Sequence, residues 1–392
     1  MLIGIVGAPN KGKSTLFSAL TMSEVEIADY PFTTINPNLG VAYATKECAE
    51  RSLHVKCRPR NSLCVDGTRL IPVNIVDVAG LVEGAHHGKG MGNQFLNDLA
   101  AADALMLVVD ASGKTDANGN PSENSNPVDD VRLVRNELVE WLSSIIKRHM
   151  PQLSRRPNGT DALSEILAGL KVSKDEIKNA AESNFLTTSN IAWPDADIRK
   201  FSEALLNRSK PILLLANKSD APGSAERVQL LEKQFGKDNV VSCSAAIELA
   251  LRKAAKHGII DYHPGATDFK ILKDELPKEQ ADALKYMKTF VGKGGTGVQN
   301  AINRVLFKLL DDIVVYPVED DGKYSDHSGN VLPDAIPIKK GSTALDLAAK
   351  IHTDIASGML YAIDARTKMR LAKDYVLKDG DVIKIVTAAK PK

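Results

Sequence analysis

The feature that most constrains the fold is a glycine-rich octapeptide, GAPNKGKS at residues 7–14, which directly follows the apolar N-terminal run. The pattern G-x-x-x-x-G-K-[ST] between a strand and a helix is typical of a phosphate-binding loop in a parallel α/β sheet. Backbone N–H groups must converge on phosphate oxygens there, and any side chain at Gly7 or Gly12 would crowd them. Lys13 supplies a cation to the outer phosphates, and Ser14 supplies a hydroxyl to Mg²⁺. The residues of this loop expected to contact a nucleotide are Asn10, Lys11, Gly12, Lys13, Ser14 and Thr15.

A second motif, NKSD at residues 217–220, follows another apolar run and indicates recognition of a guanine base. The Asp220 carboxylate can accept hydrogen bonds from N1 and from the exocyclic 2-amino group of guanine. Adenine lacks that amino group, and a buried polar group left unmatched costs roughly 1–3 kcal/mol. The stem of Lys218 can lie along the base or brace the phosphate loop. Alone the tetrapeptide is typical of a polar turn, but its position after the phosphate loop favours base binding by Asn217, Lys218 and Asp220.

Two further motifs are expected to hold the metal ion and to sense the terminal phosphate. Asp77 closes an apolar strand at residues 73–76. Its carboxylate would face the phosphate loop and hold Mg²⁺ through water. Gly80 can donate its N–H to a γ-phosphate. A threonine in the segment YPFTT at residues 30–34 would complete the Mg²⁺ shell only in the triphosphate state.

A fifth motif, SCSA at residues 242–245, follows Val240 and Val241. It suits backbone contacts to the base from Ser244 and Ala245. Five motifs in this order, each beside a strand, predict an α/β P-loop NTPase (Ras-like) domain that binds GTP.

Composition sets only broad limits. A chain of 392 residues is long for one small domain, so two or three are expected. Lysine plus arginine number 50 and aspartate plus glutamate 49, so only a local patch could attract a polyanion. No stretch approaches ~18 apolar residues and the N-terminus enters a core strand directly, so neither a membrane span nor a signal peptide is expected. We expect a cytoplasmic monomer that uses GTP and GDP and has no membrane partner.

Three of the four cysteines lie close together in the sequence with one histidine, which raises the question of a zinc site: Cys48, His54, Cys57 and Cys64. No C-x-x-C pair is present, and the segment lies between two expected strands of the nucleotide domain. The interpretation favoured from the sequence is buried or incidental thiols.

The hydropathy pattern divides the chain into four segments. Strand and helix signals alternate up to Asp110, and loop-forming residues fill 115–127. Helical spacing follows, beginning with Val131, Val134 and Leu138 on one face, and the sheet pattern returns only at Ile212. A second helical stretch is expected at 246–291, and a helix from Val298 would close the fold. The predicted domains are the first part of the GTPase domain at 1–126, an all-helical insertion at 127–208, the second part with extra helices at 209–310, and a β-grasp module at 311–392.

The β-grasp prediction rests on a change in the hydropathy pattern from residue 311 onward. Strands are expected at 313–318, 361–363 and 382–386, and one amphipathic helix at 343–352. About 80 residues is typical of a small domain.

The five motifs together resemble the Obg-related translation-factor GTPases. The helical insertion and the C-terminal module are similar to the YchF/Obg-like ATPase subfamily of archaeal type, whose last module is a TGS domain. Asp346-Leu347-Ala348 and Lys378-Asp379-Gly380-Asp381-Val382 carry the TGS likeness. The resemblance covers essentially the whole chain and implies ribosome association. It also places the metal-binding hydroxyl at Thr34 rather than Thr33.

Three details bear on the chemistry that this resemblance implies. Subfamily members that prefer ATP lack an intact N-K-x-D element, whereas this chain has one, which favours GTP. Ras-like enzymes orient water with a glutamine after D-x-x-G. Here that residue is Leu81, so either hydrolysis is slow or another group positions the water. The candidates for that group are His86 and His87, and His86 is preferred. Asn10 can help to hold K⁺ between the phosphates or can simply form a turn. Lys13, Thr34, Gly80 and His86 are the residues assigned to catalysis.

Three functions stay open from the sequence. The first is a slow, K⁺-assisted GTPase switch that binds the ribosome or RNA through the TGS module and the helical insertion. The second is an ATP/GTP hydrolase without an RNA partner, and the third is a protein-binding scaffold. Basic residues support the first only weakly, because ordinary solvated surface explains most of them: Lys147, Arg148, Arg155, Arg156, Lys339, Lys340, Arg366, Lys368 and Arg370.

Overall fold

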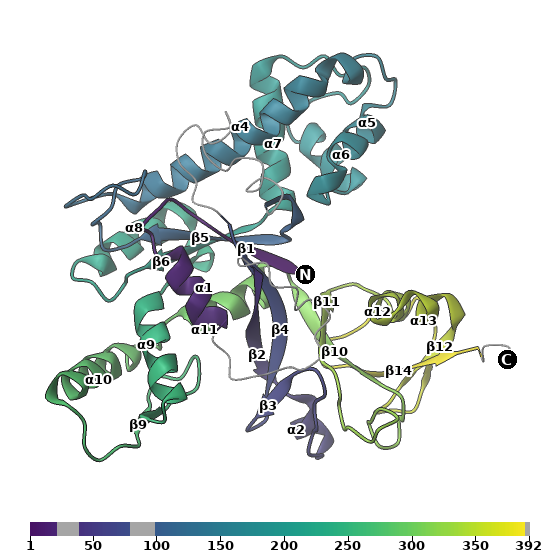
Figure 1. Ribbon diagram of the computed structural model, residues 1–392. Coiled ribbons are helices and arrows are strands. Elements are labelled where there is room, and N and C mark those ends of the chain that lie inside the picture. Colours follow the sequence, from purple (N-terminus) through teal and green to yellow (C-terminus); the bar gives the residue numbers. More distant parts are fainter. Residues whose placement is uncertain (22–38, 79–98, 389–392) are drawn as a thin grey trace. The chain divides into compact units, whose positions relative to one another are not determined.

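The computed structural model describes residues 1–21, 39–78 and 99–388 of the chain (Figure 1). The chain forms two compact units. Of the described residues, the larger comprises 1–21, 39–41, 74–78 and 99–301, and the smaller comprises 42–73 and 302–388. Within the described ranges, we find no helix with both the length and the apolar character needed to cross a membrane.

A parallel sheet organises the larger unit. Its strands lie in the order β4–β1–β5–β6–β7. Their bounds are β1 Leu2–Val6, β4 Thr68–Asp77, β5 Ala104–Asp110, β6 Ile212–Asn217 and β7 Val240–Ser242. Because the strands are parallel, their carboxyl ends meet at one edge of the sheet, which is where ligands bind in open α/β sheets. The four motifs that fall on described residues all lie at these strand ends.

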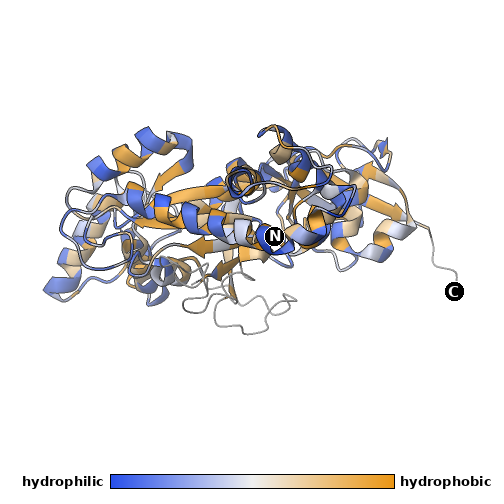
Figure 2. Ribbon diagram, turned by 90° about the horizontal axis from the view of Figure 1, so that it is seen from above, coloured by the Kyte–Doolittle hydropathy of each residue, from blue (hydrophilic) through white to orange (hydrophobic). Residues whose placement is uncertain are grey.

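Strand β5 shows why this sheet forms. All seven of its residues are buried, as expected of a parallel strand covered on both faces. Figure 2 shows the strands as apolar and the surrounding helices as two-faced. Among the described residues of the larger unit, the α-helices outside the insertion are α1 Lys13–Thr21, α8 Ser224–Phe235, α9 Ala245–Lys256, α10 Lys278–Val291 and α11 Val298–Arg304.

The insertion predicted at 127–208 is all-helical. Its helices are α4 Pro127–Leu153, α5 Gly159–Ile166, α6 Lys174–Glu182 and α7 Asp195–Ser209, and a 3₁₀ turn at Ala168–Leu170 follows α5. Asn126 caps α4, and Ser173 with Glu176 forms a capping box on α6. The apolar face of α4 is buried in the same core cluster as residues of β5, so the insertion shares a hydrophobic core with the sheet.

The second predicted helical stretch is wrong between residues 257 and 277. There the chain forms a short antiparallel pair, β8 Ile260–Asp261 with β9 Lys270–Ile271. Tyr262 and Phe269 pack edge to face at 6.4 Å between ring centroids, within a small core that α9 and α10 complete. The helix α9 ends at Lys256, just before Gly258 with φ +64°, and Pro264 with Gly265, the latter with φ +86°, forms the turn between the strands.

The smaller unit contains the predicted β-grasp module. Its sheet has the order β11–β10–β14–β12–β13. The elements are β10 Asp312–Val318, β11 Ile336–Lys339, α12 Ala344–Ile351, α13 Thr353–Gly358, β12 Met359–Asp364, β13 Arg370–Leu371 and β14 Val382–Thr387. Thr343 and Asp346 form a capping box at the start of α12, and buried residues of α12 share a core with β10, β12 and β14.

The smaller unit also contains residues 42–73, which the sequence prediction placed with the nucleotide domain. This segment holds most of β2 Leu39–Glu47, the helix α2 Ala49–Leu53, the strand β3 Leu63–Val65 and the first half of β4. Backbone N–H groups of Arg58 and Arg60 donate to the carbonyls of Val331 and Pro333, both at 2.8 Å. These bonds tie the segment to the β-grasp module within one unit.

Candidate nucleotide-binding site

The phosphate loop lies between β1 and α1, and its two motif glycines are required by neighbouring backbone and side-chain atoms. Gly7 has φ +148°, and an added Cβ would lie 2.6 Å from the Val108 carbonyl oxygen. Gly12 has φ +93°, and a Cβ there would lie 2.3 Å from Nδ2 of Asn217. Both contacts are closer than real Cβ atoms allow. The glycines are therefore needed for the packing of the loop itself, in addition to the space that they leave for phosphates.

The reactive side chains of the loop meet Asp77 at the end of β4. Ser14 Oγ donates to Asp77 Oδ2 at 2.9 Å, and Lys13 Nζ donates to the Ala8 carbonyl at 3.0 Å. Burial lowers the pKa of Lys13, partly offset by the charge of Asp77. Burial also raises the pKa of Asp77, partly offset by the hydrogen bond from Ser14 and by Lys13. The structure thus brings together the predicted phosphate cation, hydroxyl and carboxylate.

The donor set around Asp77 fits a magnesium ion. Its Oδ1 atom is buried and has no hydrogen-bond partner among the described residues. A buried carboxylate oxygen without a partner is costly, and hard oxygen donors are the ligands that Mg²⁺ prefers. Five residues named from the sequence for the metal or for catalysis lie outside the described residues: Thr34, Gly80, Leu81, His86 and His87.

Asn217 at the end of β6 bridges two motifs rather than pointing freely into the site. Its Nδ2 donates to the Lys11 carbonyl at 2.9 Å, and its Oδ1 accepts from the Ala245 amide at 3.0 Å. Both bonds are buried. Asn217 therefore holds the phosphate loop and the Ser244–Ala245 turn at a fixed separation, and the Ala245 amide that was expected at the base is engaged by Asn217.

Lys218 braces the phosphate loop, one of the two roles considered for it from the sequence. Its Nζ donates to the Asn10 carbonyl at 2.9 Å and to Asp110 Oδ2 at 2.8 Å. Burial opposes ionisation of Asp110, but hydrogen bonds from Lys218, Ser112 and Thr115 outweigh it and hold its pKa below the usual range. Asp110, at the end of β5, was not predicted as a site residue. Its signal was its position at a strand end like Asp77 and Asn217.

Asp220 presents a carboxylate without a hydrogen-bond partner within the described part of the chain. The half-buried residue is engaged only through its backbone carbonyl, which accepts from the Tyr286 hydroxyl at 2.9 Å. The backbone amide of the neighbouring Ser219 donates a hydrogen bond to the Cys243 carbonyl at 3.1 Å. The backbone of Asp220 is thus fixed while its carboxylate is available to accept hydrogen bonds from a ligand.

Lys11 has a structural role that the sequence analysis missed. Its side chain is fully buried and forms an ion pair with Asp130 of α4 at 2.8 Å. Its Nζ also donates to Thr115 Oγ1 at 3.0 Å and to the Asp116 carbonyl at 2.7 Å. The side chain therefore points away from the phosphates and anchors their loop to residues 115–130. Only the backbone of Lys11 is left for a nucleotide.

Asn10 is exposed and takes the left-handed conformation, with φ +61°. Its Nδ2 donates to the Gly119 carbonyl at 3.0 Å, so the 115–127 segment, predicted only as a loop, lies against the phosphate loop. Gly119 itself has φ +87°, and a Cβ there would lie 2.4 Å from the Pro9 carbonyl. The amide oxygen of Asn10 has no hydrogen bond among the described residues.

The Ser244–Ala245 turn is supported by a buried network that sequence reasoning did not identify. Ser244 caps α9 through the Ile247 amide, and its own amide donates to the Thr296 carbonyl at 2.9 Å. Glu248 accepts from the Thr296 hydroxyl at 2.6 Å and from the Tyr262 hydroxyl at 2.7 Å. Thr296 in the glycine-rich segment 292–297 thus positions the Ser244–Ala245 turn.

The basic residues named from the sequence are mostly paired with acids or carbonyls. In the insertion, Lys147 pairs with Asp195 and Arg156 with Glu165, while Arg148 and Arg155 have no side-chain partner in the described ranges. The pairs in the β-grasp module are Lys339 with Asp312, Lys340 with Asp311, Lys368 with Asp321, Arg366 with the Gly380 carbonyl, and Arg370 over the Tyr361 ring. No continuous unpaired basic stripe is seen in either part of the described chain.

Three segments match known family models. Residues 2–148 match the model described as 50S ribosome-binding GTPase. Residues 215–320 match the G4 motif-containing domain of Obg-like, YGR210-like GTPases, and residues 328–387 match the TGS domain. These matches confirm the predicted P-loop fold and the C-terminal TGS module.

Similar proteins span nearly the whole chain. An uncharacterized GTP-binding protein of Methanocaldococcus jannaschii is 51% identical, over 99% of this chain and 100% of the relative. The ribosome-binding ATPase YchF of Escherichia coli O157:H7 is 30% identical over 97% of each chain. The crystal structure of a GTP binding protein from Pyrococcus horikoshii OT3 is 38% identical with a TM-score of 0.79, over 99% of this chain and 100% of that one. The chain therefore belongs to the YchF/Obg-like family of GTPases.

Proposed function

We propose that this protein is a Mg²⁺-dependent enzyme that hydrolyses GTP slowly and prefers guanine over adenine nucleotides. The observation that carries the base preference is the Asp220 carboxylate, which has no partner in the described chain although its backbone is fixed. N1 and the 2-amino group of guanine are the donors that this acceptor lacks, and adenine offers neither. Affinities for GTP, GDP, ATP and ADP on one purified sample test the preference, and equal affinity for GTP and ATP would overturn it.

Ser14, Thr34 and Asp77 are the residues that would hold magnesium, with Asp77 acting through water. When bound, the ion neutralises charge that develops on the β- and γ-phosphates. The buried oxygen of Asp77 supports this assignment within the described chain, and Thr34 rests on its motif alone. Lys13 would bind the outer phosphates, and Gly80 would contact the terminal one.

Slow hydrolysis follows from Leu81, which has no group to orient the attacking water. His86 is our candidate for that task because an imidazole can place a water or accept a proton near neutral pH. Its assignment rests on the sequence, since the segment lies outside the described residues.

Hydrolysis is expected to be faster in K⁺ than in Na⁺ at matched ionic strength. Asn10 motivates this prediction because its side chain sits on the phosphate loop with the amide oxygen left over. The variant Asn10→Gly keeps the positive φ at low cost while removing that oxygen, so it should lose the K⁺ effect and still bind nucleotide. Identical initial rates in both salts for the wild-type protein would remove Asn10 from any catalytic role.

We also propose that the protein binds the ribosome through the helical insertion and the TGS module. The family model for residues 2–148 and the name of the Escherichia coli relative support this. Deleting the TGS module by truncation after Asp312 would be a poor test of ribosome binding. The truncation removes the Leu332 and Pro333 carbonyls, to which buried Arg69 donates, and would therefore disturb the remaining fold. Reversing the charge of exposed residues tests the same proposal without removing part of the fold.

The double variant Arg148→Glu with Arg155→Glu is expected to lower ribosome co-sedimentation severalfold without changing nucleotide affinity. Both residues lie exposed in the insertion without a described side-chain partner, so they are available to phosphates. Binding through phosphates should also weaken steeply with added salt. The matched control is Lys278→Glu on α10, outside both segments. Full retention of binding by the double variant, or a salt-independent affinity, would contradict the proposal.

A further inference from the structure

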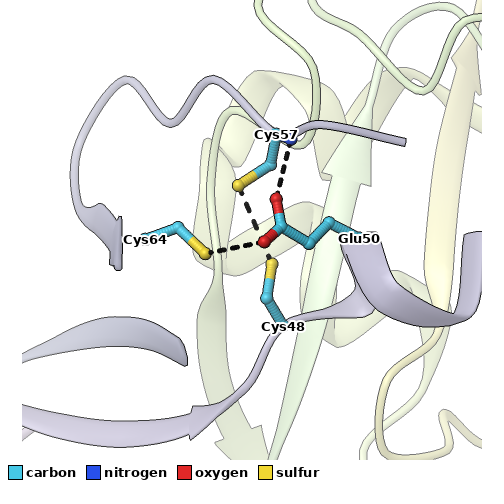
Figure 3. A group of neighbouring side chains, drawn as sticks. All are labelled: Cys48, Glu50, Cys57 and Cys64. Carbon is cyan, nitrogen blue, oxygen red and sulfur yellow. Dashed lines mark hydrogen bonds between the residues drawn. The ribbon is translucent and has the colours of Figure 1, made fainter. Parts of the chain in front are cut away.

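Three cysteines and one glutamate meet in the smaller unit. Cys48 directly precedes α2, Glu50 lies on α2, Cys57 follows it, and Cys64 lies in β3. Their side chains point toward a common centre (Figure 3). The four ligand atoms, three Sγ and one carboxylate oxygen, all lie within 4.8 Å of one another. His54, which the sequence suggested as a partner, is exposed and does not belong to the group.

The spacing of these atoms approaches that of a tetrahedral metal centre. Cys48 Sγ lies 3.9 Å from Cys57 Sγ, and Cys64 Sγ lies 3.4 Å from Glu50 Oε1. Zn–S bonds of about 2.3 Å in a tetrahedron place sulfur atoms about 3.8 Å apart, and sulfur–oxygen edges are slightly shorter. An ion would therefore fit with only small shifts of the side chains. Cys48 is buried and the other three are half-buried, so water has limited access.

The backbone around the cluster holds the ligands in place. The Cys57 amide donates to Glu50 Oε2 at 2.9 Å, which fixes the carboxylate and leaves Oε1 on the side of Cys64. The Cys48 amide donates to the Gly67 carbonyl at 2.8 Å, so the β3–β4 turn is tied to the start of α2. Such outer hydrogen bonds orient the ligands in known metal sites.

A buried cation beside the cluster indicates that its centre is anionic. Arg69 is fully buried and stands opposite Cys64 in the β3–β4 register. Its Nη2 donates to the Leu332 and Pro333 carbonyls, its guanidinium lies 5.8 Å from the Tyr316 ring centroid, and Nε and Nη1 have no hydrogen-bond partner among the described residues. The positive charge of Arg69 helps to lower the pKa of Glu50, so the cation already acts on the cluster. Three thiolates and a carboxylate around a divalent cation carry net negative charge and would compensate the buried guanidinium more fully.

The segment buries few apolar side chains, although hydrogen bonds such as those from the Arg58 and Arg60 amides tie it to the rest of the smaller unit. The helix α2 has five residues and β3 has three. Leu63 and Val65 of β3 are exposed, and residues 48–65 contribute nothing to the described core cluster of the TGS module. Short segments without a hydrophobic core are commonly stabilised by a metal or a disulfide. Both chemistries are available here.

We propose that Cys48, Glu50, Cys57 and Cys64 form a structural zinc site that staples residues 48–65 in the smaller unit. Soft thiolates select zinc among the common divalent metals, and four protein ligands leave no open position for catalysis. Binding replaces the three S–H protons, which pass to the buffer. A Cys48–Cys57 disulfide is the competing arrangement, and the experiment separates the two.

The test measures metal in the untagged full-length protein, purified with a thiol reductant and without chelators. Elemental analysis should find about one zinc per chain. Exchange with Co²⁺ should give thiolate-to-cobalt charge-transfer bands and the intense visible bands of a tetrahedral site. The double variant Cys57→Ser with Cys64→Ser should lose both signals. The variant His54→Asn should keep both signals. His54 is an exposed neighbour of the cluster with a left-handed backbone, which asparagine tolerates.

Glu50→Gln provides a second readout in case the cysteine variants do not fold. Glutamine can still accept from the Cys57 amide but is a poorer ligand, so a competing chelator should remove zinc at a concentration at least about tenfold lower. The cobalt spectrum should also change. Protein that takes up neither zinc nor cobalt after reduction would overturn the proposal. Metal retained by the double cysteine variant, or a Cys48–Cys57 disulfide in metal-free protein purified without oxygen, would do the same.

Discussion

Replacing Lys11 with methionine is expected to destabilise the larger unit by about 3–5 kcal/mol at pH 7, because it leaves the Asp130 carboxylate buried without a counter-charge. The two side chains are 0% and 3% exposed and lie 2.8 Å apart. Within the described ranges, the donor that remains for the Asp130 carboxylate is the Asp110 amide at 3.2 Å. Urea unfolding without nucleotide, followed by far-ultraviolet circular dichroism, measures the loss as a lower midpoint.

The loss in this variant should shrink as the pH falls. Burial raises the pKa of Asp130 to about 6 even with Lys11 present, and removing that cation raises it further. The unfolded chain titrates aspartate near pH ~3.9, so between the two values the folded form binds more protons and gains stability on acidification. The deficit should therefore be largest above the folded pKa and fade toward pH ~4.

Asp130→Asn is the matched control for Lys11→Met. Lys11 would keep Thr115 Oγ1 and the Thr115 and Asp116 carbonyls as acceptors, so this variant should lose less stability. The double variant should recover part of the loss, since removing both charges leaves no unpaired ion. An unfolding midpoint for Lys11→Met that matches the wild type, or a deficit that grows on acidification, would show that the pair is not a buried anchor.

The sequence predicted well those elements whose signals are local. The strand β5 is nearly all apolar and ends at Asp110, and α4 carries Val131, Val134 and Leu138 on one face, so the end of the first sheet pattern and the start of the helical insertion were both predicted. The hairpin of β8 and β9 was missed because each strand has only two residues, too few to show an alternating pattern. Its two aromatic residues pack with α9 and α10, the helices on either side of it in sequence, and such packing leaves no periodic signal.

Within the site, motif spacing identified ligand-facing residues but not the scaffold that holds them. Lys11 lies inside the phosphate-loop motif and was expected to contact the nucleotide, but nothing in the motif indicated that its side chain pairs with Asp130, 119 residues away. Asn217 was assigned to the base, and the motif gave no sign that its side chain also bridges Lys11 and Ala245. Glu50 was missed as a partner of the cysteines because carboxylates are common and only the α2 turn brings this one to Cys57.

The substitution Asp220→Asn should reverse base preference rather than merely weaken binding. The amide offers one donor and one acceptor where the carboxylate offers two acceptors, so the bond from the 2-amino group of guanine is lost. GTP affinity should fall at least about tenfold, about 1.4 kcal/mol. Xanthine carries a carbonyl oxygen at that position, which the N–H of the introduced side-chain amide can bind, so affinity for xanthosine triphosphate should rise by a similar factor.

The expected gain in affinity for xanthosine triphosphate distinguishes base recognition from damage to the fold, because a misfolded site would lose affinity for both nucleotides. Competition against a fluorescent nucleotide measures both affinities on the same sample. The same change of acid to amide at exposed Glu226 of α8, Glu226→Gln, is the control and should leave both affinities unchanged. Loss of GTP binding without a gain for the xanthine nucleotide would assign Asp220 to the scaffold, alongside Asn217 and Lys218. Unchanged GTP affinity would remove it from the site altogether.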